Sequence, residues 1–287
     1  MNFRLIKNNS QFSAYLGLFD EKKTTVIALD TEAELNLHAY GETLCLVQIF
    51  DGTDRVLIDP FNIDLELLKS FFENRNTLKV VYDAASDLSL MKNTYGIEIK
   101  SILDLRPAVR LLNLEKQDLH SVLASEMGVL LEHKSKFQRH NWTLRPISAE
   151  ALEYAVNDIA YLLQLKSILL KKLYDSQLLD TYILDNLKIQ NKDYTRNPNE
   201  KYTRVNGYSE LLEEEKLIAL ELGRIIEKYA CEYNIPSHWV IPKNDVIEIV
   251  KDPDTLNRLQ LPNRFSKDSM LGILNELKAA AKRNNRG

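Results

Sequence analysis

The chain has 287 residues, of which 45% are hydrophobic and 27% are charged, and its formal net charge is −4. This length exceeds the roughly 100–200 residues that one domain usually holds, so we expect two domains. The composition excludes a disordered chain. The negative charge argues against a protein that coats nucleic acid through bulk positive charge, although a protein that grips only a strand end remains compatible with it.

The sequence shows neither a membrane-spanning or signal-peptide pattern nor a paired-cysteine motif. No apolar run approaches the roughly 20 residues that span a bilayer, and the first residues lack the apolar core of a signal peptide. We therefore expect a cytoplasmic protein without a membrane partner. Cys45 and Cys231 form no CxxC pair, so we expect two buried thiols rather than a zinc site or a disulfide.

The first half of the chain alternates short apolar runs with helical patterns. Runs rich in Val, Ile, Leu and Thr predict strands over residues 24–29, 43–50, 55–58, 78–81 and 99–103. Helical patterns follow over residues 64–72, 86–94, 118–127 and 148–173, the last with Ser148 as its N-cap. The first three strands are separated only by loops, which indicates an antiparallel start. This order predicts an α/β fold, a mixed sheet flanked by helices.

A linker divides the chain near residue 200. Residues 191–207 lose apolar periodicity and gain Asn, Pro and Gly, so we expect domains over residues 1–190 and 208–287. After the linker, helical patterns cover residues 211–229, 245–250, 253–260 and 266–282. Because no strand pattern occurs there, the second domain is expected to be a small all-α bundle.

Asp30 and Glu32 stand two residues apart where the strand over residues 24–29 ends. Alternate residues of a strand face the same side, so these two carboxylates face together and Thr31 points away. Like charges held on one face repel each other unless a cation lies between them. Taken alone, the motif is more simply interpreted as a solvated strand end.

Two further motifs each contribute an acid. Asp87 falls in the first turn of the helix expected after residues 78–81, where an acid also stabilises the helix dipole. Tyr154 and Asp158 lie four residues apart and therefore share one face of a helix. A tyrosine packed over a half-buried acid is the alternative interpretation. Neither motif alone identifies a site.

Together, in this order and spacing, the three motifs resemble the RNase D family, the tyrosine-bearing branch of the DEDD superfamily of 3′-5′ exonucleases. The resemblance runs from VIALDTEAELNLHAYGETLCLVQIFDG through KVVYDAASDL to LEYAVNDIAYLL, over residues 24–170. Beyond the linker, EEEKLIALELGRIIEKYACEYNIPSHWVIPKNDVIEIV is similar to the helicase-and-RNase-D C-terminal (HRDC) domain, a helical nucleic-acid-binding module. The resemblance implies a ribonuclease H-like fold for the first domain.

The resemblance also implies roles for five residues. Asp30, Glu32, Asp87 and Asp158 match the family's metal-binding acids, and Tyr154 matches its tyrosine, which orients or helps deprotonate the attacking water. Such oxygen ligands suit two Mg²⁺ or Mn²⁺ ions about 3.5–4 Å apart. The implied reaction releases nucleoside 5′-monophosphates from single-stranded 3′ ends of RNA, and precursors of tRNA and other stable RNA are the expected substrates.

A basic stretch precedes the helix that carries Tyr154. Its five basic side chains are candidates for binding substrate phosphates: Lys134, Lys136, Arg139, His140 and Arg145. A solvated basic loop is an equal alternative for the stretch, and a surface histidine is the simpler interpretation of His140. Trp142 is expected to be a packing anchor.

The chain departs from the family pattern in several places. Relatives often have His-Ala where this chain has Tyr82-Asp83, which adds an acid near the proposed metals. One helical module follows the linker where longer relatives have two, which puts a ring-like enclosure of RNA in doubt. Asp104, at a strand-to-helix junction, is expected to act as a cap.

Two alternatives to RNA cleavage are a catalytically inactive RNA-binding scaffold and the same chemistry on DNA. The presence of all five matched residues favours catalysis.

Overall fold

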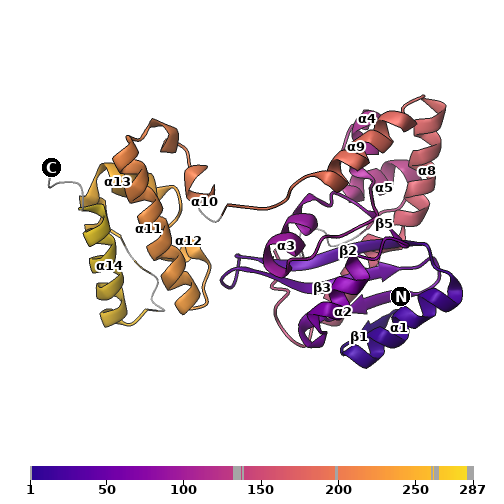
Figure 1. Ribbon diagram of the computed structural model, residues 1–287, viewed down its shortest axis with the longest axis horizontal. Coiled ribbons are helices and arrows are strands. Elements are labelled where there is room, and N and C mark those ends of the chain that lie inside the picture. Colours follow the sequence, from indigo (N-terminus) through magenta and orange to yellow (C-terminus); the bar gives the residue numbers. More distant parts are fainter. Residues whose placement is uncertain are drawn as a thin grey trace. The chain divides into compact units, whose positions relative to one another are not determined.

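The computed structural model describes residues 2–131, 137, 139–197, 200–259, 261 and 265–282. The chain divides into two compact units (Figure 1). The sheet unit comprises Met1–Glu34 and Glu42–Thr195, and the helical unit comprises Leu35–Gly41 and Arg196–Gly287. Each unit is considered by itself below.

The sheet unit is built on a mixed sheet of six strands in the order β1-β4-β3-β2-β5-β6. The strands are β1 (Arg4–Ile6), β2 (Val26–Leu35), β3 (Glu42–Phe50), β4 (Arg55–Ile58), β5 (Leu78–Val81) and β6 (Ile102–Asp104). β3 pairs antiparallel with β4, whereas β1–β4, β2–β5 and β5–β6 pair in parallel. The predicted mixed sheet is confirmed, with β1 as an additional strand that the sequence patterns did not indicate.

Helices cover both faces of this sheet (Figure 1). They are α1 (Asn9–Lys22), α2 (Leu65–Phe72), α3 (Ala85–Tyr95), α4 (Arg106–Leu111), α5 (Leu119–Met127), α7 (Ala149–Ala160), α8 (Leu162–Asp175) and α9 (Leu179–Asn191), with a 3-10 turn, η1, at Pro60–Asn62. Ile27 and Leu29 of β2 pack with α1, α2 and α3 in one core. Ala28, between them, packs with α4, α5 and α8 in another. The alternation of β2 therefore assigns each of its residues to one helical layer.

The helix predicted over residues 148–173 is in fact two helices. Ser148 caps the first as expected, since its Oγ accepts the backbone N–H of Ala151. Tyr161 separates α7 from α8, with φ −113° and ψ −5°. The break separates the residues of α7 that belong to the candidate site from the α8 leucines that build the core.

The edge strand β6 is closed by side chains of α9. Asn186 accepts the backbone N–H of Asp104 at 2.7 Å, and Gln190 accepts that of Ile102 at 3.1 Å. An open edge strand offers unpaired backbone groups to other chains. These two amides occupy the groups that would otherwise be available.

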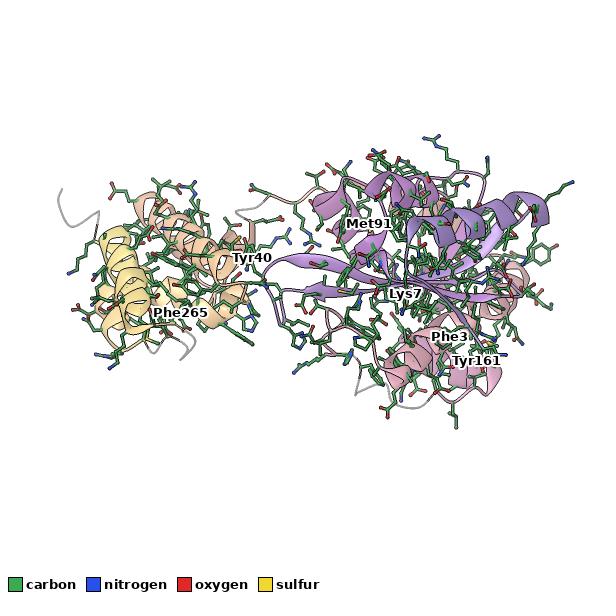
Figure 2. All side chains as sticks on the ribbon, turned by 90° about the horizontal axis from the view of Figure 1, so that it is seen from below. Phe3, Lys7, Tyr40, Met91, Tyr161 and Phe265 are labelled. Atoms are coloured by element: carbon green, nitrogen blue, oxygen red, sulfur yellow. The ribbon has the colours of Figure 1, made fainter. Side chains whose placement is uncertain are left out.

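Apart from Leu35, the last residue of β2, the described part of the helical unit contains no strand residue, as predicted for the second half of the chain. Its elements are α10 (Glu200–Thr203), η2 (Tyr208–Glu210), α11 (Glu213–Glu232), α12 (Ser237–Val240), α13 (Asp245–Lys251), η3 (Pro253–Asn257) and α14 (Lys267–Ala281). Tyr40, in the loop that follows β2, packs against the apolar core of the helical unit (Figure 2). Asn36 of that loop bonds Ser237 through its side-chain amide.

Both cysteines were expected to be buried, and no membrane-spanning segment was expected. Cys45 is buried as predicted, but the prediction for Cys231 is wrong, because this thiol near the end of α11 is exposed. It lies outside the apolar stripe through which α11 packs. Within the described ranges, every helix is too short or too polar to traverse a lipid bilayer.

A glycine in α11 provides a stability test of the helical unit. A Cβ added to Gly223 would lie 2.6–2.9 Å from ring atoms of Tyr202, whereas a Cβ added to Gly272 in α14 would meet nothing within 4 Å. We expect Gly223→Ala to lower the free energy of unfolding by about 1–3 kcal/mol through overpacking. Gly272→Ala should raise it by about 0.5–1 kcal/mol through helix propensity. Urea denaturation followed by circular dichroism measures both, and equal effects would contradict the close packing at Gly223.

Candidate active site

Three carboxylates converge where β2 passes beneath α7. Asp30 and Glu32 project from β2, and Asp158 projects from α7, with one oxygen of each within 4.8 Å of the others. Asp158 is buried, and the two β2 acids are half-buried. The strand alternation places Asp30 and Glu32 on the Ala28 side of the sheet, so both face the layer that contains α7. Segments more than 120 residues apart thus contribute to one acidic cluster.

Asp87, the fourth predicted acid, reaches this region from α3. Its Oδ1 accepts a hydrogen bond from the Thr31 hydroxyl. Thr31 points away from Asp30 and Glu32 as predicted, and it therefore faces the layer that contains α3. Burial raises the pKa of Asp87 to about 6, and the bond from Thr31 opposes that shift. Asp87 lies outside the group of three, yet its charge raises the pKa of Asp30.

The cluster concentrates negative charge in a poorly hydrated place. Burial, followed by the charges of Asp87 and Asp158, raises the pKa of Asp30 well above its usual range. Burial and then Asp30 do the same for Glu32. Carboxylates arranged in this way are stabilised by a bound cation. Oxygen donors alone suit a hard divalent ion such as Mg²⁺ or Mn²⁺, so the residues present fit such a metal.

Two neighbours of the cluster were not identified from the sequence. Gln48, fully buried on β3, donates its amide N–H to Glu32 at 3.3 Å. His120 of α5 lies with Nε2 3.1 Å from Oδ1 of Asp158. Both contacts fix the direction of a carboxylate. No local motif marks either residue, because each becomes a neighbour only through the sheet order and the packing of α5 on α7.

Tyr154 lies one helical turn before Asp158, as the spacing predicted. Its pKa is raised first by burial and then by the charges of Asp158 and Glu32. Phe137 stacks on its ring with centroids 5.0 Å apart, and the buried Trp142 lies 6.4 Å from it. Trp142 is thus a packing residue, as expected. At neutral pH the phenol keeps its proton, so its hydroxyl can donate a hydrogen bond.

The structure describes three of the five basic residues that are candidates for binding substrate phosphates. Lys134 and Lys136 lie outside the described residues. Arg139 is exposed. His140 is half-buried rather than on the surface, with its ring edge-on to Trp142 at 4.9 Å.

Arg145 differs from its predicted role. Its guanidinium bonds both oxygens of Asp59, at 2.6 and 3.0 Å. The remaining N–H groups donate to the carbonyls of Cys45, Trp142 and Leu144. All five donors are therefore occupied, and the ring of Phe61 lies 4.0 Å below the guanidinium. Arg145 ties the basic stretch to β3 and η1 and has no donor left for a phosphate.

A cavity of about 350 Å³ opens beside the acidic cluster. Its lining joins the cluster to the ends of β5, α4 and α5: Asp30, Tyr82, Asp83, Arg106, Gln117, Asp118, Leu119, His120, Tyr154, Asp158 and Leu162. Asp104 supports one wall, since its carboxylate accepts the backbone N–H groups of Asp83, Ala84 and Arg106. Asp104 is not a helix N-cap as expected, since Leu105 holds that position in α4; its carboxylate instead joins the start of α4 to the turn before α3.

Comparison with known proteins identifies the family. The sequence profile of a 3′-5′ exonuclease domain matches residues 3–174, which is more than half of the chain and includes all four acids and Tyr154. The chain belongs to the 3′-5′ exonuclease family. Among curated relatives of this chain, ribonuclease D of Desulfotalea psychrophila is 29% identical over 233 residues, 79% of this chain and 61% of the relative. The chain spans about three fifths of the length of the curated relatives it matches.

Solved structures share the fold of this chain. Escherichia coli RNase D, described as an exoribonuclease involved in structured RNA processing, superposes with a TM-score of 0.79 at 20% identity. That match covers 100% of this chain and 76% of the other. Brucella melitensis NrnC with bound Mg²⁺ superposes with a TM-score of 0.54 at 21% identity, over 66% of this chain and 90% of the other.

The raised carboxyl pKa values predict how stability depends on pH. A group whose folded pKa exceeds its unfolded value, about 4 for a carboxyl, adds stability at low pH that is lost as pH rises through the folded pKa. For Asp87 that pKa is about 6. In EDTA, the melting temperature should therefore fall by on the order of 3 °C between about pH 5.5 and pH 7.5. Calorimetry at both pH values measures the change.

Two comparisons make this measurement specific. Asp87→Asn should flatten the pH dependence, whereas Asp180→Asn, at an exposed position of α9, should leave it as in the wild type. Saturating Mn²⁺ should raise the melting temperature more at the higher pH, because deprotonated carboxylates are the metal ligands. An absent Mn²⁺ shift at both pH values would contradict a cation site at the cluster.

Proposed function

We propose that this chain is a metal-dependent 3′-5′ exoribonuclease that releases nucleoside 5′-monophosphates from RNA 3′ ends. The observation that supports it most is the convergence of Asp30, Glu32 and Asp158, from two distant segments, inside a chain that belongs to the 3′-5′ exonuclease family. The curated relatives named ribonuclease D favour RNA as the substrate. The cavity beside the cluster has room for a ligand of the size of one nucleotide.

In this proposal Asp30, Glu32, Asp87 and Asp158 hold two divalent ions, Mg²⁺ or Mn²⁺. Bound there, such ions lower the pKa of a water molecule and stabilise the departing 3′ oxygen. The carboxylates would position the scissile phosphate only indirectly, by fixing where the bound ions lie. His120 and Gln48 hold two of those carboxylates in place.

Tyr154 orients the attacking water in this scheme. Because its pKa is raised, the phenol is protonated at neutral pH and donates its hydrogen bond instead of removing a proton. Burial against Phe137 restricts the ring to one position. A fixed donor of this kind reduces the number of unproductive water positions.

The substrate and location belong to the same proposal. Single-stranded 3′ ends of tRNA precursors and other stable RNAs are the proposed substrates, in the cytoplasm. We propose the catalytic domain at residues 1–190, a linker at 191–207, and an HRDC-like nucleic-acid-binding domain at 208–287.

The first test compares RNA with DNA. With Mg²⁺ or Mn²⁺, the protein should shorten 5′-labelled single-stranded RNA stepwise from its 3′ end, and shorten DNA of the same sequence more slowly. Asp30→Asn keeps the shape of the side chain and removes a charged ligand, so it should lower the rate by about 10³-fold or more. Denaturing gels measure the ladders, and Asp180→Asn is the matched control for one lost negative charge on an exposed helix.

Three other results of this assay would contradict the proposed function or indicate a different one. RNA binding without shortening in either metal would indicate a scaffold rather than an enzyme. Faster trimming of DNA would indicate a DNA exonuclease. An Asp30→Asn variant as active as the wild type would exclude the acidic cluster as the catalytic centre.

Tyr154→Phe separates water orientation from metal binding. Removal of the hydroxyl should lower kcat by about 10–100-fold, at the lower end of the range for positioned proton donors and acceptors. Metal affinity, measured as Mn²⁺ binding by calorimetry, should change less than about twofold because no ligand is lost. Equal loss of activity and of Mn²⁺ affinity would be incompatible with this role for Tyr154.

A further inference from the structure

Two side chains in the lining of the cavity beside the acidic cluster form an ion pair. Asp83, on the turn between β5 and α3, accepts a hydrogen bond from Nη1 of Arg106, the first residue of α4. Both residues line the cavity that also contains Asp30, Tyr154 and Asp158. Asp83 is also an acid at which this chain departs from the family pattern, and its partner lies 23 residues further along the chain.

The backbone around the pair is held in a fixed conformation. Asp83 has φ +65°, in the left-handed region that few residues other than glycine adopt. Its N–H donates to Asp104, and the N–H of Arg106 donates to the same oxygen, each at 2.9 Å. One carboxylate thus fixes the positions of both partners. Their side chains, by contrast, are accessible from the cavity, with 49% of Asp83 and 39% of Arg106 exposed.

The charges in the cavity give Arg106 a distinctive position. Four carboxylates line the cavity: Asp30, Asp83, Asp118 and Asp158. Among the lining residues, Arg106 is the one with a permanent positive charge. Its Nε is buried and has no hydrogen-bond partner in the described part of the chain. One N–H of Nη1 bonds Asp83, and the half-exposed guanidinium carries further Nη N–H groups, whose geometry suits two oxygens of a phosphate.

We propose that Arg106 binds the backbone phosphate next to the one held at the acidic cluster, and that Asp83 competes with the strand for Arg106. This inference rests on the proposed function, because the strand end must enter the same cavity. When the phosphate arrives, the guanidinium exchanges the Asp83 carboxylate for phosphate oxygens. Asp83 then lowers RNA affinity and favours release of the strand between steps.

The test measures binding in the full chain with Asp158→Asn, which prevents cleavage, in Mg²⁺. Fluorescence anisotropy with a 5′-labelled single-stranded RNA gives Kd. Arg106→Gln should raise Kd about tenfold, and the slope of log Kd against log salt should fall by about 0.7, the value for one phosphate contact on a single strand. Arg110→Gln, one turn further along α4 and outside the cavity lining, should change Kd less than about twofold.

The competing carboxylate is tested in the opposite direction. Asp83→Asn should lower Kd by about two- to fivefold, because an exposed ion pair contributes little and its loss frees the guanidinium. RNA with one uncharged methylphosphonate linkage, next to the terminal linkage, should bind wild type and Arg106→Gln equally. Thermal melting establishes that each variant is folded.

Several outcomes would overturn the inference. They are an unchanged Kd in Arg106→Gln, an effect equal to that of Arg110→Gln, weaker binding in Asp83→Asn, or an Arg106→Gln effect that persists on the methylphosphonate RNA. Failure of the proposed function is distinguishable, since it shows as absent RNA shortening by the wild type. The binding comparison does not depend on that rate.

Discussion

The side-chain alternation of β2 is the constraint on which the rest of the site depends. Residues two apart face one side of a strand, so Ala28, Asp30 and Glu32 face α7 and α8 while Ile27, Leu29 and Thr31 face α1, α2 and α3. A shift of one residue in the pairing of β2 with β5 would exchange these sets. It would bury the two acids in the apolar core and remove them from Asp158. The register is therefore fixed by the same apolar residues that place the carboxylates.

The site stores electrostatic repulsion that the surrounding fold must offset. Asp30, Glu32 and Asp158 lie close together, and burial raises the pKa of the two β2 acids. Contacts from Gln48, His120 and Thr31 each reach one carboxylate, and they come from β3, α5 and β2 itself. The scaffold can hold this arrangement because both faces of the sheet carry complete apolar cores. Stability in the cores thus compensates strain at the site, and a bound cation would relieve it.

The sequence predicted what depends on local pattern and on the family motifs. Five strands, the mixed sheet and the helical second unit follow from alternation, periodicity and spacing, whereas the meeting of Asp30, Glu32 and Asp158 was implied by the family resemblance. α1 was not predicted, because its buried Phe12, Tyr15 and Phe19 are embedded among polar residues. The three-residue β1 is too short to carry a pattern. Arg145 was misassigned because its partner Asp59 lies 86 residues away, and such contacts have no local signal.

The acidic lining of the cavity beside the cluster limits how a negatively charged nucleic-acid strand can bind there. With four carboxylates and one arginine in its lining, the cavity repels a phosphate strand unless cations are present. A divalent ion at the cluster lowers the cost of bringing in the phosphate, and by linkage the phosphate raises the affinity for the ion. Metal and strand would therefore bind cooperatively, each weakly alone. The net charge of −4 fits this arrangement, since it limits adsorption along the length of a strand and leaves affinity concentrated where a free end reaches the carboxylates.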